Sequence, residues 1–203
     1  MQYAQKFTAD NCIFLQKIVK YNKRNRKNSA EKGDEMYSKD DIVMYTSQGV
    51  CKITDITTKE IGGKSIEYYV LKPIYSDTAL VYIPIANETL TGKMRRVLSK
   101  EEILTLIHSI EKEDQPWIEN EHIRKEKYKE ILSCGDRHGL ISMIKALYVH
   151  RKYLNEHGKK MHVVDERFFK EAEKILYEEF AFVLNIKLEE VLPFIKDRLG
   201  IED

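Results

Sequence analysis

The sequence contains few residues that break or cross-link a chain, with four prolines, nine glycines and three cysteines among 203 residues. So little proline and glycine excludes collagen-like and low-complexity chains. The cysteines, Cys12, Cys51 and Cys134, are odd in number and form no CxxC pair that could bind zinc, so we expect reduced thiols. No stretch approaches the roughly 18 consecutive apolar residues of a membrane span, and no apolar run precedes a small-residue cleavage site. We therefore expect a soluble, cytoplasmic protein of one or two compact units.

The net charge is only +1, which would argue against a nucleic-acid partner if the charges were evenly spread along the chain. Residues 1–35 carry +4, residues 36–116 carry −2, residues 117–162 carry +4 and residues 163–203 carry −5. The near neutrality is thus a cancellation between unlike segments, which is compatible with one basic face and one acidic face.

Residues 1–35 differ from the rest, because a short amphipathic run, Cys12–Val19, leads into a basic and polar tract. Such a tract cannot bury enough apolar area to fold, so we expect a disordered extension. One interpretation is a nucleic-acid-binding arm. The other, which we favour, is a start-site artefact, since Lys32–Glu35 before Met36 can be encoded by a purine-rich ribosome-binding site. The working protein would then begin at Met36 with a net charge of −3.

From residue 37 to residue 84 the pattern is that of β-strands. Short runs rich in β-branched and aromatic residues predict strands at residues 42–45, 51–56, 57–61, 65–72 and 79–83. Gly62 and Gly63 separate two of these runs and predict a hairpin, because glycine accepts the positive φ of a tight turn. Five short strands in about fifty residues predict a small SH3-like or Tudor-like β-barrel.

From Ser99 onward the apolar spacing becomes helical, and Ser99 with Glu102 matches a capping box. Further helices are expected at about 119–132 and 136–155, from about 165 onward, and at 188–199, with Pro193 in the first turn of the last. Strands followed by helices predict an α+β fold. We expect a β-barrel domain at residues 36–98 and an all-α helical domain at residues 99–203.

The sequence has no P-loop, no G-x-S-x-G elbow and no H-E-x-x-H pair. A Cys134/His138 dyad at helical spacing is conceivable, but an unreactive thiol beside a basic helix is the better interpretation. We therefore expect no enzymatic activity, no catalytic residue, no metal ion and no cofactor.

Basic residues cluster near the single tryptophan, Trp117. Lysine and arginine bind phosphates by charge without reading sequence, and an aromatic wedge can insert at an unstacked base step in the minor groove. The residues expected to contact DNA are Trp117, Arg124, Lys125, Arg151, Lys152, Lys159 and Lys160. The alternative is a solvated helix face, interleaved with glutamates, and a tryptophan that belongs to the core.

The order of several motifs is informative. The segments Met36–Tyr45, Gln48–Ile53, Glu60–Lys64, Glu67–Leu71 and Val81–Pro84 resemble the amino-terminal part of CarD family transcription regulators, the CarD/CdnL/TRCF RNA polymerase-interacting domain. Downstream, Trp117, Ser133–Asp136 and Tyr177–Ala181 resemble the helical domain of that family in a Firmicutes-like form. The resemblance covers about residues 36–186.

This resemblance implies a monomeric bacterial protein that regulates transcription. Its barrel would bind the RNA polymerase β subunit, and its helical domain would contact promoter DNA, weakly and non-specifically, in the minor groove at the upstream edge of the bubble. Trp117 would be the wedge that slows bubble collapse, usually at ribosomal promoters.

The polymerase contacts would fall at Lys59, Ile61 and Tyr82. Ile61 could equally be an ordinary barrel residue, and Tyr82 stands where many relatives have arginine. Ile118–Glu121 replaces an arginine-rich stretch of some relatives. The main alternative function is a protein-interaction adaptor without DNA contact, and a further one is a hydrolase or redox enzyme that uses Cys134.

Overall fold

The computed structural model describes residues 37–46, 48–76, 80–110 and 117–199. Every helix and strand described below belongs to one compact unit, Ser38–Asp203. The predicted disordered extension at residues 1–35 and the amphipathic run within it lie outside the described residues.

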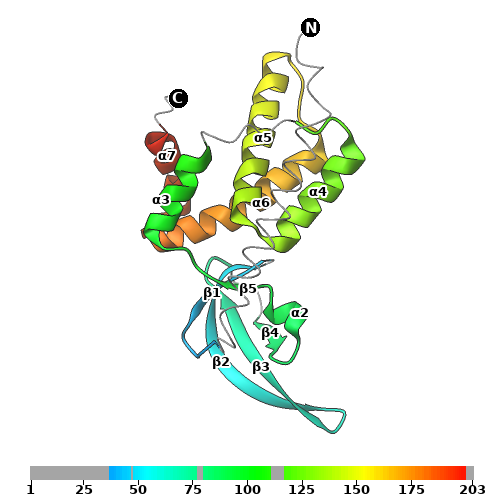
Figure 1. Cartoon of the computed structure of the whole chain (residues 1–203), viewed down its shortest axis with the longest axis vertical. Coiled ribbons are helices and arrows are strands. Elements are labelled where there is room, and N and C mark those ends of the chain that lie inside the picture. Colours follow the sequence, from blue (N-terminus) through cyan, green and yellow to red (C-terminus); the bar gives the residue numbers. More distant parts are fainter. Residues whose placement is uncertain (1–36, 47, 77–79, 111–116, 200–203) are drawn as a thin grey trace. The chain divides into compact units, whose positions relative to one another are not determined.

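Five antiparallel strands form a sheet (Figure 1): β1 (Ile42–Tyr45), β2 (Gly49–Ile61), β3 (Lys64–Pro73), β4 (Val81–Pro84) and β5 (Met94–Arg96). Their order across the sheet is β4-β3-β2-β1-β5. The runs predicted at 51–56 and 57–61 are one continuous strand, β2, because no turn residue interrupts them. A β-bulge between Ile53 and Asp55 shifts the register with β3.

The hairpin between β2 and β3 turns at the predicted place. Ile61 pairs with Lys64, and Gly62 and Gly63 between them have φ values of 58° and 75°. Both values lie in the left-handed region, which side chains other than glycine rarely adopt. The glycine pair therefore fixes the register of the longest strand pair in the sheet.

The β-barrel prediction needs correction, since among the described residues the sheet is open. The edge strand β4 pairs with β3 and the edge strand β5 with β1, and these two edges do not pair with each other. Two elements were not anticipated: β5 is only three residues long, and the short helix α2 (Glu88–Thr91) is capped by Asn87. The predicted α+β class is correct.

The remaining helices are α3 (Lys100–Ser109), α4 (Glu121–Cys134), α5 (Arg137–Glu156), α6 (Val163–Leu184) and α7 (Leu188–Arg198). The capping box at Ser99 is present, with its hydroxyl accepting from the Glu102 N–H. Between α4 and α5, Gly135 ends one helix with φ 57° and Asp136 caps the next. Pro193 is the sixth residue of α7 and lies in its second turn, so its predicted place in the first turn was wrong.

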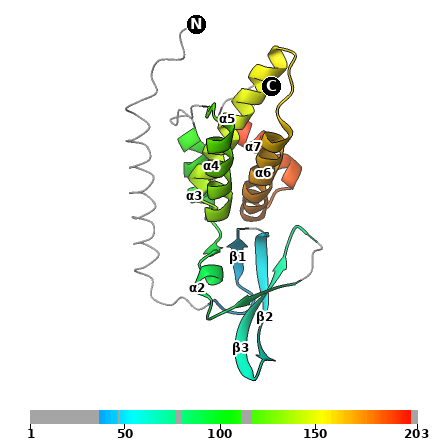
Figure 2. The same ribbon diagram turned by 90° about the vertical axis from the view of Figure 1, so that its right-hand side faces the viewer.

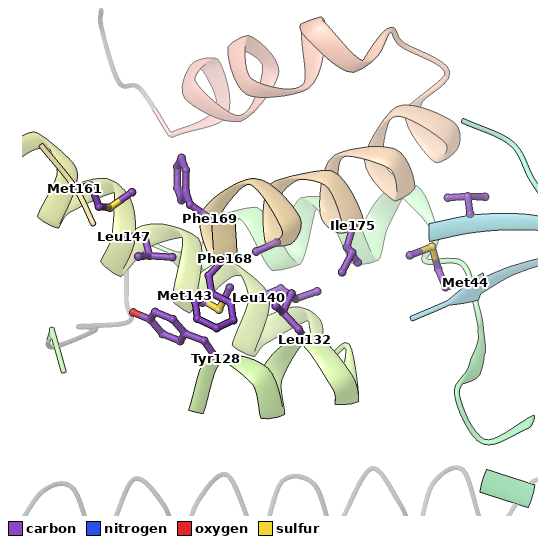
Figure 3. Packing of buried hydrophobic residues seen from close by; sticks show 12 residues of the cluster. Met44, Tyr128, Leu132, Leu140, Met143, Leu147, Met161, Phe168, Phe169 and Ile175 are labelled. Carbon is purple, nitrogen blue, oxygen red and sulfur yellow. The ribbon is translucent and has the colours of Figure 1, made fainter. Parts of the chain in front are cut away.

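Helices α4, α5 and α6 pack against one another (Figures 1 and 2) around a core of buried aliphatic and aromatic residues. Figure 3 shows this cluster, to which helical residues such as Leu140 and Phe168 contribute together with Met44 of β1. Val50 of β2 also belongs to it. The sheet and the helices therefore share one core within Ser38–Asp203. None of the described helices is long and apolar enough to cross a membrane.

Candidate functional site

The three residues expected to contact polymerase lie on one face of the sheet. Tyr82 on β4 pairs with Val70 on β3, and Val70 pairs with Asp55 on β2. Directly paired residues share a face, and side chains along a strand alternate between faces. Lys59 and Ile61 follow Asp55 by even numbers of residues, so they lie on the same face as Tyr82.

Two of these side chains, Lys59 and Tyr82, also contact each other across the sheet. The Nζ atom of Lys59 lies 3.5 Å from the centroid of the Tyr82 ring, a cation–π geometry. Tyr68 meets the same ring edge-on at a centroid distance of 6.3 Å. Ile61 is 55% exposed and Tyr82 is 40% exposed. We call Lys59, Ile61, Tyr68 and Tyr82 the docking face.

The outer part of the docking face is basic. Lys64 pairs with Ile61 and adds a second ammonium group to this face, whereas Glu60 and Glu67 belong to the opposite face. A shallow open hollow lies beside the docking face and is lined in part by Ile66 and Pro84. The surface thus offers cations, the exposed ring of Tyr82 and an apolar depression, a combination that suits an acidic protein partner.

Trp117 is half-buried, and its indole contacts the imidazole of His150 and the guanidinium of Arg124. Its indole stacks on the imidazole of His150 at a centroid distance of 3.5 Å with an angle of 9° between the planes. The guanidinium carbon of Arg124 lies 4.3 Å from the indole. Two side chains therefore contact the indole rings and restrict the orientation of Trp117.

Arg124 is itself fixed by a buried ion pair. Its Nε and Nη2 atoms donate to the two carboxylate oxygens of Asp165 at 3.0 and 2.9 Å, and Nη1 donates to the Ile118 carbonyl at 2.7 Å. The side chains of Arg124 and Asp165 are 7% and 3% exposed. The predicted phosphate contact of Arg124 is therefore not supported by this geometry, and the residue positions Trp117 instead.

The surroundings of His150 disfavour its protonated form. Its burial lowers the pKa, and the positive charge of Arg124 lowers it further, while Asp165 and Glu119 act in the opposite direction. A neutral ring stacks on the indole without placing a second positive charge against Arg124.

The other residues expected to contact DNA divide into two groups. Lys125 pairs with Glu121 one helical turn away, and the Arg151 guanidinium lies 4.5 Å from the Phe169 ring. Lys152, Lys159 and Lys160 are exposed. In the described part of the chain no carboxylate pairs with these three lysines. Successive residues of a helix are rotated by about 100°, so Lys152 lies about 200° around α5 from His150. Lys159 and Lys160 follow the end of that helix.

Sequence reasoning missed the contacts that α6 makes with the strand-rich segment. Glu179, which is 1% exposed, accepts hydrogen bonds from the Arg137 guanidinium and from the Leu98 N–H at 2.9 Å. Its neighbour Glu178 accepts from the Val50 N–H, and an added Cβ at Gly49 would collide with its carboxylate. The sequence did contain a signal for these contacts, namely two adjacent glutamates inside the apolar stripe of a helix. Carboxylates are rarely buried without partners, so such glutamates indicate hydrogen bonds or ion pairs with other segments.

Two of the three cysteines lie in the described residues, and both are free. Cys51 is buried, and its burial raises the pKa of the thiol to about 12, so the reactive thiolate is disfavoured at neutral pH. Cys134 is exposed near the end of α4. Cys12 lies outside the described residues.

The fold and these surfaces define a class: an α+β protein whose antiparallel sheet presents a basic and aromatic face and whose helices carry a clamped tryptophan. Comparison with known families makes this more specific. Residues 37–98 match the family described as the CarD-like/TRCF RID domain. The chain therefore contains a CarD-like RNA polymerase-interacting domain, which confirms the resemblance over the strand-rich segment and supports a role in transcription with RNA polymerase as partner.

The matched segment is less than a third of the chain and ends before the helices α3 to α7. No curated protein matches the chain.

Proposed function

We propose that this protein is a transcription regulator that binds the RNA polymerase β subunit through the docking face and stabilises the promoter open complex through Trp117. The observation that carries the proposal is the shared position of Lys59, Ile61 and Tyr82 on one exposed face of a CarD-like domain. A contact surface needs its residues together, and residues separated by about twenty positions meet here through strand pairing.

On the polymerase side, the Lys59 ammonium is an exposed cation supported by the Tyr82 ring. The long-range attraction of this charge guides an acidic surface toward the sheet. The exposed side chains of Tyr82 and Ile61 supply apolar contact once the surfaces meet. An interaction guided by charge and completed by a small apolar contact is expected to be transient and salt-sensitive.

On the DNA side, Trp117 inserts into the minor groove at the upstream edge of the bubble, where a base step is already unstacked. The clamp of His150 and Arg124 keeps the indole in one orientation, so little side-chain entropy is lost on insertion. Lys159 and Lys160 add phosphate contacts without sequence preference.

The mechanism needs no catalysis and no cofactor. A protein that binds the open complex better than the closed complex lengthens the life of the open complex by that differential affinity. Attachment to polymerase raises the effective concentration of Trp117 at the promoter to the millimolar range, so a weak DNA contact is sufficient. Ribosomal promoters are the expected targets, as the family resemblance implies.

The docking part is tested by polymerase binding at low ionic strength. Lys59→Gln should weaken binding to the β subunit about two- to ten-fold, because it removes one exposed interfacial charge. Thr58→Glu, the matched control, changes the charge by the same amount on the opposite face of the same strand and should have little effect. Equal binding by both variants would contradict the proposed docking face.

The alternative is an adaptor of the transcription machinery that has no direct DNA contact. It is favoured by the burial of Arg124 and the partial burial of Trp117, which are also compatible with a purely structural role. If Trp117→Ala leaves open-complex lifetime unchanged while Lys59→Gln weakens polymerase binding, the adaptor is the correct function.

A further inference from the structure

A row of aromatic rings continues from Trp117 along α5 toward solvent. After the stacked pair of Trp117 and His150, the ring of Tyr153 follows His150 at a centroid distance of 6.5 Å with an angle of 27°. The imidazole of His157 follows Tyr153 at 4.3 Å and 39°. We call Trp117, His150, Tyr153 and His157 the aromatic ladder.

The ladder follows from helix geometry. His150, Tyr153 and His157 are spaced by three and four residues, so they occupy one side of α5. Helix α5 ends at Glu156, and His157 is held by an Nδ1 contact of 2.7 Å with the Tyr153 carbonyl oxygen. The last two rings therefore have a defined orientation at the end of the helix.

Exposure increases along the ladder. Trp117 and His150 are half-buried, whereas Tyr153 is 55% exposed and His157 is also exposed. Val149, one helical turn before Tyr153, is 58% exposed and extends the apolar surface. An exposed aromatic and aliphatic strip of this kind points to a ligand with flat, apolar faces.

Positive charge lies at the outer end of the ladder. Lys159 and Lys160 follow His157 closely in the chain, and both are exposed. Among the described residues neither has a carboxylate partner, in contrast to Lys125, Lys127 and Lys129 on α4, each of which pairs with a glutamate. Lys159 and Lys160 are therefore available to bind an anion next to the exposed rings.

From these observations we infer that the aromatic ladder binds single-stranded DNA by stacking unpaired bases on Tyr153 and His157 while Lys159 and Lys160 contact the phosphates. Single-strand binding surfaces combine stacking rings with a basic path for the backbone. Duplex DNA suits the ladder less, because its bases are stacked on each other and expose only their edges. The place where this binding acts, the melted strand next to Trp117, rests on the proposed function; the binding itself does not.

The test uses the full chain and a fluorescent oligodeoxynucleotide of about 15 nucleotides, a length within the range that single-strand binding surfaces cover. Anisotropy at low ionic strength should show tighter binding of the single strand than of the same strand in a duplex. Tighter or equal binding of the duplex would overturn the inference.

Tyr153→Leu should weaken binding of the single strand about five-fold or more, the loss expected for one stacked base. Tyr148→Leu is the matched control, because Tyr148 is 43% exposed on the same helix but lies about 160° around it from His150. Both variants should keep the circular dichroism of the wild type. Equal effects of the two substitutions would overturn the inference.

The double variant Lys159→Gln with Lys160→Gln should reduce the slope of log binding constant against log salt by about 1.4, which is about 0.7 for each lost phosphate contact. An unchanged slope would contradict the assigned role of these lysines. Binding of single strands without any effect on open-complex lifetime would contradict the proposed function alone, and the reverse result would contradict this inference alone.

Discussion

Trp117 stacks on His150 with the two ring planes only 9° apart, and it is the single tryptophan of the chain. Intrinsic fluorescence therefore reports directly on the state of this contact. Burial and the positive charge of Arg124 lower the pKa of His150 from the ordinary histidine value of about 6.5, so the folded protein binds this proton at a lower pH than the unfolded chain does.

The first prediction is a fluorescence transition of Trp117 below pH 6.5. Protonation places a second cation against an indole that already contacts Arg124, so we expect quenching and partial loss of the stack as the pH falls. The folded form binds this proton less tightly than the unfolded form, so the stabilising contribution of His150 is present above about pH 6.5 and is lost as the pH falls through its lowered pKa. His150→Gln should abolish the transition. A transition of the same midpoint in that variant would assign it to another group.

The second prediction concerns the buried ion pair beneath Trp117. Arg124→Met should lower the free energy of unfolding by about 3–5 kcal/mol, because it leaves the Asp165 carboxylate buried without its charged partner. The adjacent substitution Lys125→Met removes a partly exposed pair with Glu121 and should cost less than about 1 kcal/mol. Urea unfolding of both variants at pH 7 makes the comparison. Similar decreases in the free energy of unfolding would show that the ion pair of Arg124 does not hold Trp117 in place.

The third prediction contrasts two neighbouring glutamates on α6. Burial raises the pKa of Glu178, so the folded state binds this proton more tightly, and its stabilising effect is lost as the pH rises through the raised pKa. Glu178→Gln should therefore raise the free energy of unfolding at neutral pH. Glu179→Gln should lower it by about 3 kcal/mol, because it removes the charged partner of Arg137. The free energy of unfolding of both variants, measured by denaturation from pH 4 to pH 8, tests both predictions. A change in the same direction in both variants would contradict this account.

Local signals in the sequence were enough to predict the features that depend on neighbouring residues. The turn at Gly62 and Gly63 follows from the φ that a two-residue hairpin needs, and the start of α3 follows from the capping box of Ser99 and Glu102. The last helix begins at Leu188 as predicted, but Pro193 is its sixth residue and so lies beyond the first turn, where it was expected.

Features that depend on distant residues could not be predicted in this way. β5 carries two arginines in three residues, and nothing in that pattern shows that it pairs with β1 and leaves the sheet open. The ion pair of Arg124 joins residues 41 positions apart, and for this reason a residue expected on the surface turned out to be buried. The contact of Lys59 with Tyr82 likewise required the strand register.

The central claim is that Trp117 prolongs the life of the promoter open complex, and a competitor-challenge experiment tests it most directly. Open complexes formed on a ribosomal promoter are challenged with a polyanion, and their decay is followed with wild-type protein, with Trp117→Ala and with Ile123→Ala, which removes an exposed apolar residue from α4. The account predicts slower decay with the wild type and with Ile123→Ala, and loss of most of this effect with Trp117→Ala although the variant still binds polymerase. Equal decay with the wild type and Trp117→Ala would contradict it.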